Sequence, residues 1–452
     1  MSGTRPHFEA EGRDLLADPI YNFVEFTIPT SSNIDEVTER TLINSRWLQR
    51  LREIYQLQTV RWVYPAGEHT RFQHVIGAMH LGGRFANRVY DSLKECHPDV
   101  ASRQYVEELL RVTGLLHDVG HGPFGHFFDH EFLLPKYRIT HEDLGQRIIE
   151  KYFSSQIREI RRSPSGLFGT DERLDPNYVS YLINKQAKPK NMPQWVQKLK
   201  PLLTGIYTID NLDYVSRDSY ACGLSTGSLF VDRLLHYSFV TEGGLTLHQR
   251  GIEALKMFLT IKAYLFSNVY FHRTVRAFDL HLREIFRPTL ELIVRRDPRR
   301  DLESYLHLTD HTLFAQVREW EGSHSQTRRR LAAEWAALLS RTKKWIFVCG
   351  DVMPFLESLG LTRPLTAKDV KRRMRRYVPR RIRFNVEVST HDPRPDNLTN
   401  MGQEQFYVYE EGRSPQVNKA TLEDHFRGVA SLVVLCRVYA EDRKNRIISR
   451  LA

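Results

Sequence analysis

The sequence predicts a mainly α-helical protein that ends in a smaller α+β lobe. Apolar side chains recur at helical spacing in residues 106–116, 206–218 and 253–285. Beyond a basic turn at residues 295–300, the runs Trp345 to Cys349, Arg381 to Val388 and Leu432 to Tyr439 indicate strands between helical stretches. We therefore expect three segments, namely an N-terminal strand or hairpin segment at 1–42, a helical core at 43–295 and a C-terminal α+β lobe at 296–452.

Local signals divide the first part of the chain into elements. Residues 19–30 alternate enough to form a short strand or hairpin, and Ile43 to Leu57 presents one apolar helical face. Thr70 opens a capping box, which predicts a helix that carries His74 in its first turn. Thr140 can cap a further helix.

The composition is that of a soluble globular protein. Of 452 residues, 41% are hydrophobic and 26% are charged. The four cysteines are scattered, which argues against a disulfide scaffold or a zinc ribbon and fits the reducing cytosol. We see no signal peptide and no apolar run of membrane-spanning length, so we expect a cytoplasmic protein that uses no membrane. The net charge of +11 favours polyanionic partners such as nucleotides or nucleic acid.

The stretch from Leu115 to His126 is the most informative part of the chain. Its glycines and proline end an apolar helix beside three histidines and one aspartate. The adjacent pair His117 and Asp118 offers an imidazole nitrogen and a carboxylate oxygen, a mixture suited to iron, manganese, nickel, zinc or magnesium. The simpler interpretation is a helix end whose histidines favour the helix dipole. Four such side chains among glycines favour the metal site.

Two other charged stretches each have more than one possible structural role. One face of the predicted helix near residue 210 carries polar side chains, namely Asp210, Asp213, Tyr214, Arg217 and Asp218. A solvated face with a single weak ion pair, worth about 0.3–0.5 kcal/mol, explains this stripe equally well. Lys371 to Arg383 is strongly basic, and such a run is a solvated face, an oligomer contact or a site for polyanions.

Together these motifs resemble the HD-domain phosphohydrolases, in which His, His-Asp and Asp follow one another on helices. The likeness is greatest to the deoxynucleoside triphosphate (dNTP) triphosphohydrolases, including the SAM-and-HD-domain enzymes and their bacterial relatives, although no segment here resembles a SAM domain. The string HDVGHGPFGHFFD at 117–129 is the most specific match. HTRFQH at 69–74, THE at 140–142 and DNLDY at 210–214 support it. The resemblance runs from about Asp18 to Ile285.

The resemblance implies a role for each residue that matches the family pattern. The implied metal ligands are His74, His117, Asp118 and Asp210. The implied catalytic set beside the α-phosphate is His121, Asp129 and His141. The implied contacts to sugar and phosphates are Gln56, Leu57, Arg71, His126, Tyr214, Asp218, Lys262, Tyr270 and Arg273. Asn211 stands where the family enzyme has a lysine, so we expect weaker triphosphate binding.

The implied reaction is hydrolysis of a dNTP to a deoxynucleoside and triphosphate, with a divalent metal ion as cofactor. The family also implies a homo-oligomer, dimer or tetramer, and a possible nucleotide effector. Two alternatives stay open. One is an HD phosphatase or phosphodiesterase that acts on another nucleotide. The other is a regulatory protein that binds nucleic acid and has only a secondary HD site.

Overall fold

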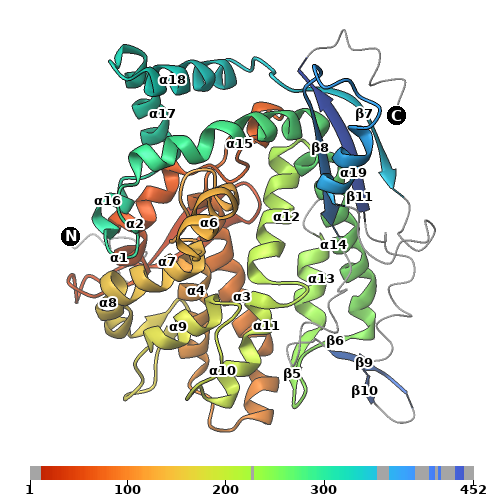
Figure 1. The fold of residues 1–452 in the computed structure, drawn as a ribbon. Helices are drawn as coiled ribbons and strands as arrows, with labels where there is room; N and C mark the ends of the chain where they lie inside the picture. Colours follow the sequence, from red (N-terminus) through yellow and green to blue (C-terminus); the bar gives the residue numbers. More distant parts are fainter. Residues whose placement is uncertain are drawn as a thin grey trace, which may run out of the picture.

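The computed structural model describes residues 12–224, 229–353, 366–391, 407–412, 416–418 and 433–441. Within these ranges the chain is mainly helical and has four small sheets (Figure 1). This confirms the predicted fold class, a helical core with small sheets towards the C-terminus. The predicted strand position Leu432 and the first eleven residues lie outside the described part of the chain.

The elements follow one another in this order. The helices up to the middle of the chain are α1 (Glu39–Ile43), α2 (Arg46–Gln49), α3 (Arg71–Cys96), α4 (Arg103–Leu116), α5 (His126–Phe128), α6 (Leu134–Tyr137), α7 (His141–Ile148), α8 (Ser154–Glu159), α9 (Pro176–Ile183), α10 (Gln194–Leu199) and α11 (Pro201–Thr204). The later helices are α12 (Ile209–Ala221), α13 (Leu229–Tyr237), α14 (Ile252–Tyr264), α15 (Arg273–Ile293), α16 (Leu302–Leu306), α17 (Asp310–Glu319), α18 (Gln326–Leu339) and α19 (Ala367–Met374). The strands are β1 (Arg13–Asp18), β2 (Asn22–Thr27), β3 (Arg162–Ser163), β4 (Gly166–Leu167), β5 (Ser238–Thr241), β6 (Gly244–His248), β7 (Ile346–Met353), β8 (Phe384–His391), β9 (Tyr407–Glu410), β10 (Gln416–Asn418) and β11 (Val433–Ala440).

Helices α3 and α4 form the centre of the core, and their apolar faces are fully buried. Gly114 of α4 lies against the backbone of α3, where a Cβ atom would be 2.6 Å from the carbonyl oxygen of Ala78. Only glycine permits this approach without a shift of one helix. The close packing brings the start of α3 beside the end of α4, which is where the conspicuous histidines lie.

Capping boxes fix the starts of the helices that matter most for the site. Thr70 caps α3 and Thr140 caps α7, as the sequence predicts, and Thr208 caps α12 in the same way. In each box the threonine and the residue three positions later satisfy each other's backbone N–H group. The side chains in the first turn of each helix therefore have defined positions.

The prediction of one helix from Ile43 to Leu57 is wrong. Two short helices, α1 and α2, and a 3₁₀ turn replace it, and the backbone is extended at Ile54. The segment after Ile54 pairs with the loop before α3, because the backbone N of Gln56 donates to the carbonyl oxygen of His69 at 3.0 Å. Tertiary pairing thus overrides the helical pattern, and Gln56 lies in a loop.

The long helix expected from Glu253 to Ile285 is also divided. Helix α14 continues into a π-helical turn at Leu265–Tyr270, and the chain breaks before α15 begins at Arg273. His272 caps α15 through its side chain, which accepts a hydrogen bond from the backbone N of Thr274. The apolar pattern correctly predicts helical structure but does not reveal this break.

The core does not end at the basic turn of residues 295–300. Apolar side chains of α16, α17 and α18, including the fully buried Trp335, belong to the same hydrophobic cluster as α3 and α4. Strands β7, β11 and β8 form an antiparallel sheet, which packs with α19 around a small cluster of its own. This sheet lies beside α15 (Figure 1). The division into segments at residue 295 stays a prediction. Among the described helices, none is both long and apolar enough to cross a membrane.

Candidate active site

Three helices bring the predicted metal ligands together. His74 lies in the first turn of α3, and Asp210 is the second residue of α12. His117 and Asp118 follow directly after the last residue of α4. Since capping boxes start α3 and α12, the two helices present His74 and Asp210 from fixed ends.

The four donor groups surround one small space. His74 Nε2 is 3.2 Å from His117 Nε2. Asp210 Oδ1 is 3.1 Å from His74 Nε2 and 3.7 Å from His117 Nε2. Asp118 Oδ1 is 3.3 Å from His117 Nε2, and Asp118 Oδ2 is 3.8 Å from His74 Nε2. We call His74, His117, Asp118 and Asp210 the ligand group.

Hydrogen bonds behind the two imidazoles decide which nitrogen faces this space. His74 Nδ1 is 2.8 Å from Asp213 Oδ2, and His117 Nδ1 is 2.7 Å from the carbonyl oxygen of Gly114. Both partners only accept hydrogen bonds, so both Nδ1 atoms donate and both Nε2 atoms of the neutral rings carry a lone pair. Two facing lone pairs repel each other unless a cation lies between them. The donor set therefore fits a divalent metal ion.

The charges of the ligand group also suit a cation. Burial alone would lower the pKa of His74, but hydrogen bonds with Asp210 and Asp213 raise it to about 10, so without a metal ion Nε2 holds a proton that a bound cation would displace. Burial would raise the pKa of Asp118, but His117 and then Arg71 lower it well below its ordinary value. The carboxylates therefore stay ionised and attract positive charge.

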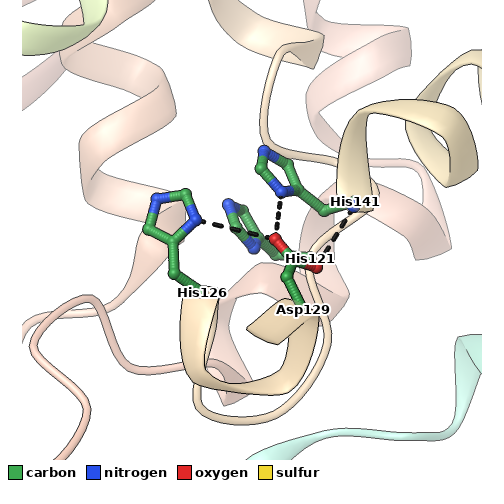
Figure 2. A group of neighbouring side chains, drawn as sticks. All are labelled: His121, His126, Asp129 and His141. Carbon is green, nitrogen blue, oxygen red and sulfur yellow. Dashed lines mark hydrogen bonds and ion pairs between the residues drawn. The ribbon is translucent and has the colours of Figure 1, made fainter. Parts of the chain in front are cut away.

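A second group of side chains lies next to the ligand group, and Figure 2 shows it. Asp129 Oδ2 accepts a hydrogen bond from His141 Nδ1 at 2.5 Å, and Asp129 Oδ1 accepts one from the His141 backbone at 3.1 Å. His126 Nδ1 lies 3.6 Å from Asp129 Oδ2. The ring of His121 stacks on that of His141, with 3.6 Å between centroids and 14° between planes. We call these four residues the relay group.

Asp129 and His121 give the relay group its chemistry. Because Asp129 accepts the proton on Nδ1 of His141, the basic nitrogen of that ring is Nε2. His121 joins the two groups, since its Nε2 is 3.3 Å from Asp118 Oδ1. Burial, and next the charge of Arg71, lower the pKa of His121 well below its ordinary value. His121 is therefore neutral, and the imidazoles of the relay group lie where they can accept or pass protons.

Gly120 permits the stacking of the two histidines. A Cβ atom at this position would lie 2.0 Å from the carbonyl oxygen of His141. The start of α7 therefore packs directly on the loop that follows α4. Tyr305 OH donates to the carbonyl oxygen of Gly120 at 2.7 Å and holds the loop from the other side. The glycines of the central motif thus serve close packing as well as the turn.

Both groups open on one cavity of about 530 Å³. His117, Asp118 and Asp210 line it from the ligand group, and His126 and His141 line it from the relay group. This volume falls within the range of sites for small molecules, roughly 300–1,000 Å³. One bound molecule can therefore contact the ligand group and the relay group at the same time.

Most residues predicted to contact the substrate line this cavity. They are Gln56, Leu57, Arg71, His126, Tyr214, Asp218 and Tyr270. Arg273 does not line it, because its guanidinium lies exposed, 5.6 Å from the centre of the Phe347 ring. Arg276, less than one turn further along α15, lines the cavity instead. The placement of Arg273 therefore gives no support to its predicted contact with substrate.

Asn211, which stands in place of the family's lysine, does not line the cavity. Its Oδ1 accepts a hydrogen bond from the backbone N of Thr208 at 2.6 Å, and its Nδ2 donates to the carbonyl oxygen of Ile206 at 3.1 Å. The side chain is thus used in the capping box of α12. Lys262 does not line the cavity either. Burial lowers the pKa of its ammonium to about 8, while the charge of Asp210 raises it.

Sequence reasoning missed Lys185 and Glu142, which both line the cavity. Glu142 follows His141 at the start of α7, and Lys185 lies in the loop after α9. Glu142 Oε2 accepts a hydrogen bond from the backbone N of Lys185 at 3.3 Å. Glu142 belongs to the THE motif at 140–142, but the resemblance gave it no role. No motif marks Lys185, and its nearest signal was the lysine-rich composition of this loop.

Comparison with known proteins agrees with this arrangement. The family model for the HD domain matches residues 71–214. The chain carries an HD domain. Every member of the ligand group and of the relay group lies within the matched residues. The HD domain and its His–Asp cluster are consistent with a site for a divalent metal ion and support a phosphohydrolase.

Two relatives show how distant the likeness is. The chain is 28% identical over 275 residues to the deoxynucleoside triphosphate triphosphohydrolase SAMHD1 homolog of Dictyostelium discoideum, a match that covers 60% of this chain and 50% of that protein. It is 26% identical over 330 residues to the protein YwfO of Bacillus subtilis, which covers 70% of this chain and 68% of YwfO. The chain therefore spans about half the length of the SAMHD1 homolog.

The same architecture occurs in a solved structure. A hypothetical protein from Aquifex aeolicus superimposes with a TM-score of 0.69 at 23% sequence identity, over 95% of this chain and 96% of that one. At this identity the likeness shows the fold alone. The HD domain and its C-terminal extension thus form an architecture that recurs beyond this chain.

Proposed function

We propose that this protein hydrolyses a dNTP to a deoxynucleoside and triphosphate, with a divalent metal ion as cofactor. One observation carries the proposal: a single cavity of about 530 Å³ joins the ligand group to the relay group. The distant relationship to SAMHD1 proteins supports dNTPs as the substrate class. In this reaction water adds to the α-phosphorus, the bond to the 5′ oxygen breaks, and that oxygen takes a proton.

The ligand group and Arg71 would bind the α-phosphate. Held by the ligand group, a divalent ion withdraws charge from phosphorus and makes water easier to deprotonate. Arg71 donates to Asp118 Oδ2 and also lines the cavity. Its guanidinium can therefore orient Asp118 and bind a phosphate oxygen with its remaining donors.

The relay group would move the protons. His141 presents Nε2 as a base, and Asp129 stabilises the imidazolium that forms when this nitrogen takes a proton from water. His126 is the exposed member, with 57% of its side chain accessible, and lies 3.6 Å from Asp129. We assign to His126 the return of a proton to the departing 5′ oxygen.

The opposite wall of the cavity would bind the sugar. Asp218 Oδ2 accepts a hydrogen bond from Tyr270 OH at 2.5 Å, which fixes a carboxylate for the 3′ hydroxyl. Gln56 Oε1 is buried and has no hydrogen-bond partner in the described part of the chain, and we assign it to the same 3′ hydroxyl. Leu57 beside it is apolar and offers no partner to a 2′ hydroxyl, a loss of about 1–3 kcal/mol for a buried polar group. We therefore expect dNTPs to be preferred over NTPs.

Product analysis tests this proposal. Each of the four dNTPs is incubated with the protein and Mn²⁺, Mg²⁺, Fe²⁺ or Ni²⁺, and the products are separated by ion exchange. We expect a deoxynucleoside and inorganic tripolyphosphate. Orthophosphate with dNDP, or pyrophosphate with dNMP, would instead support a phosphatase or a phosphodiesterase acting on nucleotides.

A nucleotide effector and a homo-oligomer remain predictions, and the basic segment at residues 371–383 offers a test of both. Lys371 and Arg375 line a cavity with Phe384 between α15 and the C-terminal sheet, whereas Arg372 and Arg376 are exposed. Analytical ultracentrifugation with dGTP or dATP should show a change in mass that Lys371→Gln with Arg375→Gln removes. The double variant Arg372→Glu with Arg376→Glu should still show the change in mass with nucleotide. It should lose only salt-dependent binding to nucleic acid. A constant mass with every nucleotide would exclude the effector.

A further inference from the structure

Glu142 and Lys185 form an ion pair at the edge of the cavity. Lys185 Nζ is 3.6 Å from Glu142 Oε1, and the backbone N of Lys185 donates to Glu142 Oε2. The two side chains differ in accessibility, since 60% of the Lys185 side chain is exposed and only 15% of that of Glu142. The carboxylate is therefore fixed next to His141, while the ammonium can turn towards the cavity.

The backbone that carries Lys185 is held in place. Lys200 is buried, and its Nζ donates to the carbonyl oxygens of Asn184 at 2.9 Å and of Ala187 at 3.0 Å. Asn184 also donates to Gln146 Oε1 of α7 at 3.1 Å. The loop is thus held on both sides of Lys185, at Asn184 and at Ala187. Lys185 keeps its side-chain freedom on a backbone with a defined position.

Phosphate groups next to Asp210 need positive charge, and the start of α12 does not supply it. Asn211 follows Asp210 but is buried in its capping box. Lys262 lies near Asp210 and makes no hydrogen bond or ion pair within the described part of the chain. The charges of Asp210 and of Lys185 both act on the Lys262 ammonium. Lys185 itself lines the cavity, so a polyphosphate that extends along it from the ligand group would meet the Lys185 ammonium.

We infer that Lys185 and Glu142 form a latch for the terminal phosphates of the substrate, in which phosphate oxygens take the Lys185 ammonium from Glu142. This inference rests on the proposed function, since it names how that site would bind the polyphosphate. Phosphate carries more negative charge than one carboxylate and offers several acceptor oxygens, so it competes well for an exposed ammonium. Lys262 adds a second positive charge from α14.

Binding of inorganic tripolyphosphate to the metal-loaded protein tests the latch without requiring turnover. Isothermal titration should show that Lys185→Gln weakens tripolyphosphate binding by about two- to fivefold, the range for an exposed charge pair. Orthophosphate, which is too short to span from the ligand group to Lys185, should bind equally to both proteins. Glu142→Gln should bind tripolyphosphate as tightly as the wild type or more tightly, because it removes the competing carboxylate.

Lys188→Gln is the matched control, since Lys188 lies exposed on the same loop but does not line the cavity. It should leave the Kd for tripolyphosphate unchanged. Equal affinities of the wild type, Lys185→Gln and Lys188→Gln would overturn the latch, and so would equal weakening by the two substitutions. Product analysis with dNTPs is a separate measurement, so a failure of the proposed reaction and a failure of the latch can be told apart.

Discussion

The ligand group and the relay group contain the same kinds of side chain, yet their hydrogen bonds give them different chemistry. In the ligand group, Asp213 and the carbonyl oxygen of Gly114 bind the outer nitrogens of His74 and His117, so both inner nitrogens converge. In the relay group, Asp129 binds His141 from within the cluster and occupies the nitrogen nearest to it. Residue type alone therefore does not separate a metal site from a proton relay. The hydrogen-bond partner of each imidazole ring separates the two kinds of site.

The largest effect should come from removal of a converging nitrogen. His117→Ala takes one ligand from the shared space, so we expect the bound metal and the turnover to be lost together. Elemental analysis of the purified variant, compared with the wild type, measures the first effect. Metal content equal to that of the wild type would show that His117 is not a ligand.

Removal of the Asp129 carboxylate should lower turnover without lowering metal content. Asp129→Asn leaves every member of the ligand group in place, so metal content should equal that of the wild type. Turnover should fall by roughly 10²–10⁴, the contribution of a positioned acid–base group. Rapid-quench kinetics at saturating metal would detect this loss. A variant that loses its metal would instead place Asp129 among the ligands and remove the distinction between the groups.

The local signals that start the helices of the site are confirmed, whereas the predicted connections around the site are not. The capping boxes at Thr70 and Thr140 are local signals, because each depends on two residues three positions apart. The expected helix from Ile43 to Leu57 failed because long-range partners decide that segment. Asp310 of α17 accepts a hydrogen bond from the backbone N of Tyr55 at 2.9 Å, and no pattern within the segment announces this contact.

The polar face of α12 shows the same limit within the site itself. A solvated ion pair explained Asp213 and Arg217 equally well from the sequence. In the structure both side chains are buried, and Arg217 donates to both oxygens of Asp213 at 2.8 and 2.9 Å and to Asp18 at 2.8 Å. The last residue of β1, Asp18, comes from a distant part of the chain. Periodicity could place these residues on one face but could not show what covers it.

This buried network offers the finest test of the comparison, because it acts on the ligand group only through Asp213. Asp213→Asn replaces the carboxylate that orients His74, so metal affinity should fall by roughly 10–100-fold. A competition titration with a metal-sensitive dye would measure it. Turnover at saturating metal should change far less, since no relay residue contacts Asp213. A loss of turnover with unchanged metal affinity would contradict this assignment.

Tyr21→Phe removes one hydrogen bond to Asp213 and leaves the carboxylate in place, so it should have the smallest effect of these variants. Tyr21 OH donates to Asp213 Oδ1 at 2.9 Å from the hairpin turn, while both Arg217 contacts to Asp213 remain. One hydrogen bond to a charged group contributes about 1.5–3 kcal/mol to stability, but most of the orientation of His74 is kept. We therefore expect a lower melting temperature together with metal affinity within about threefold of the wild type. An affinity as low as that of Asp213→Asn would mean that the hairpin, rather than α12 alone, sets the position of the metal ligand.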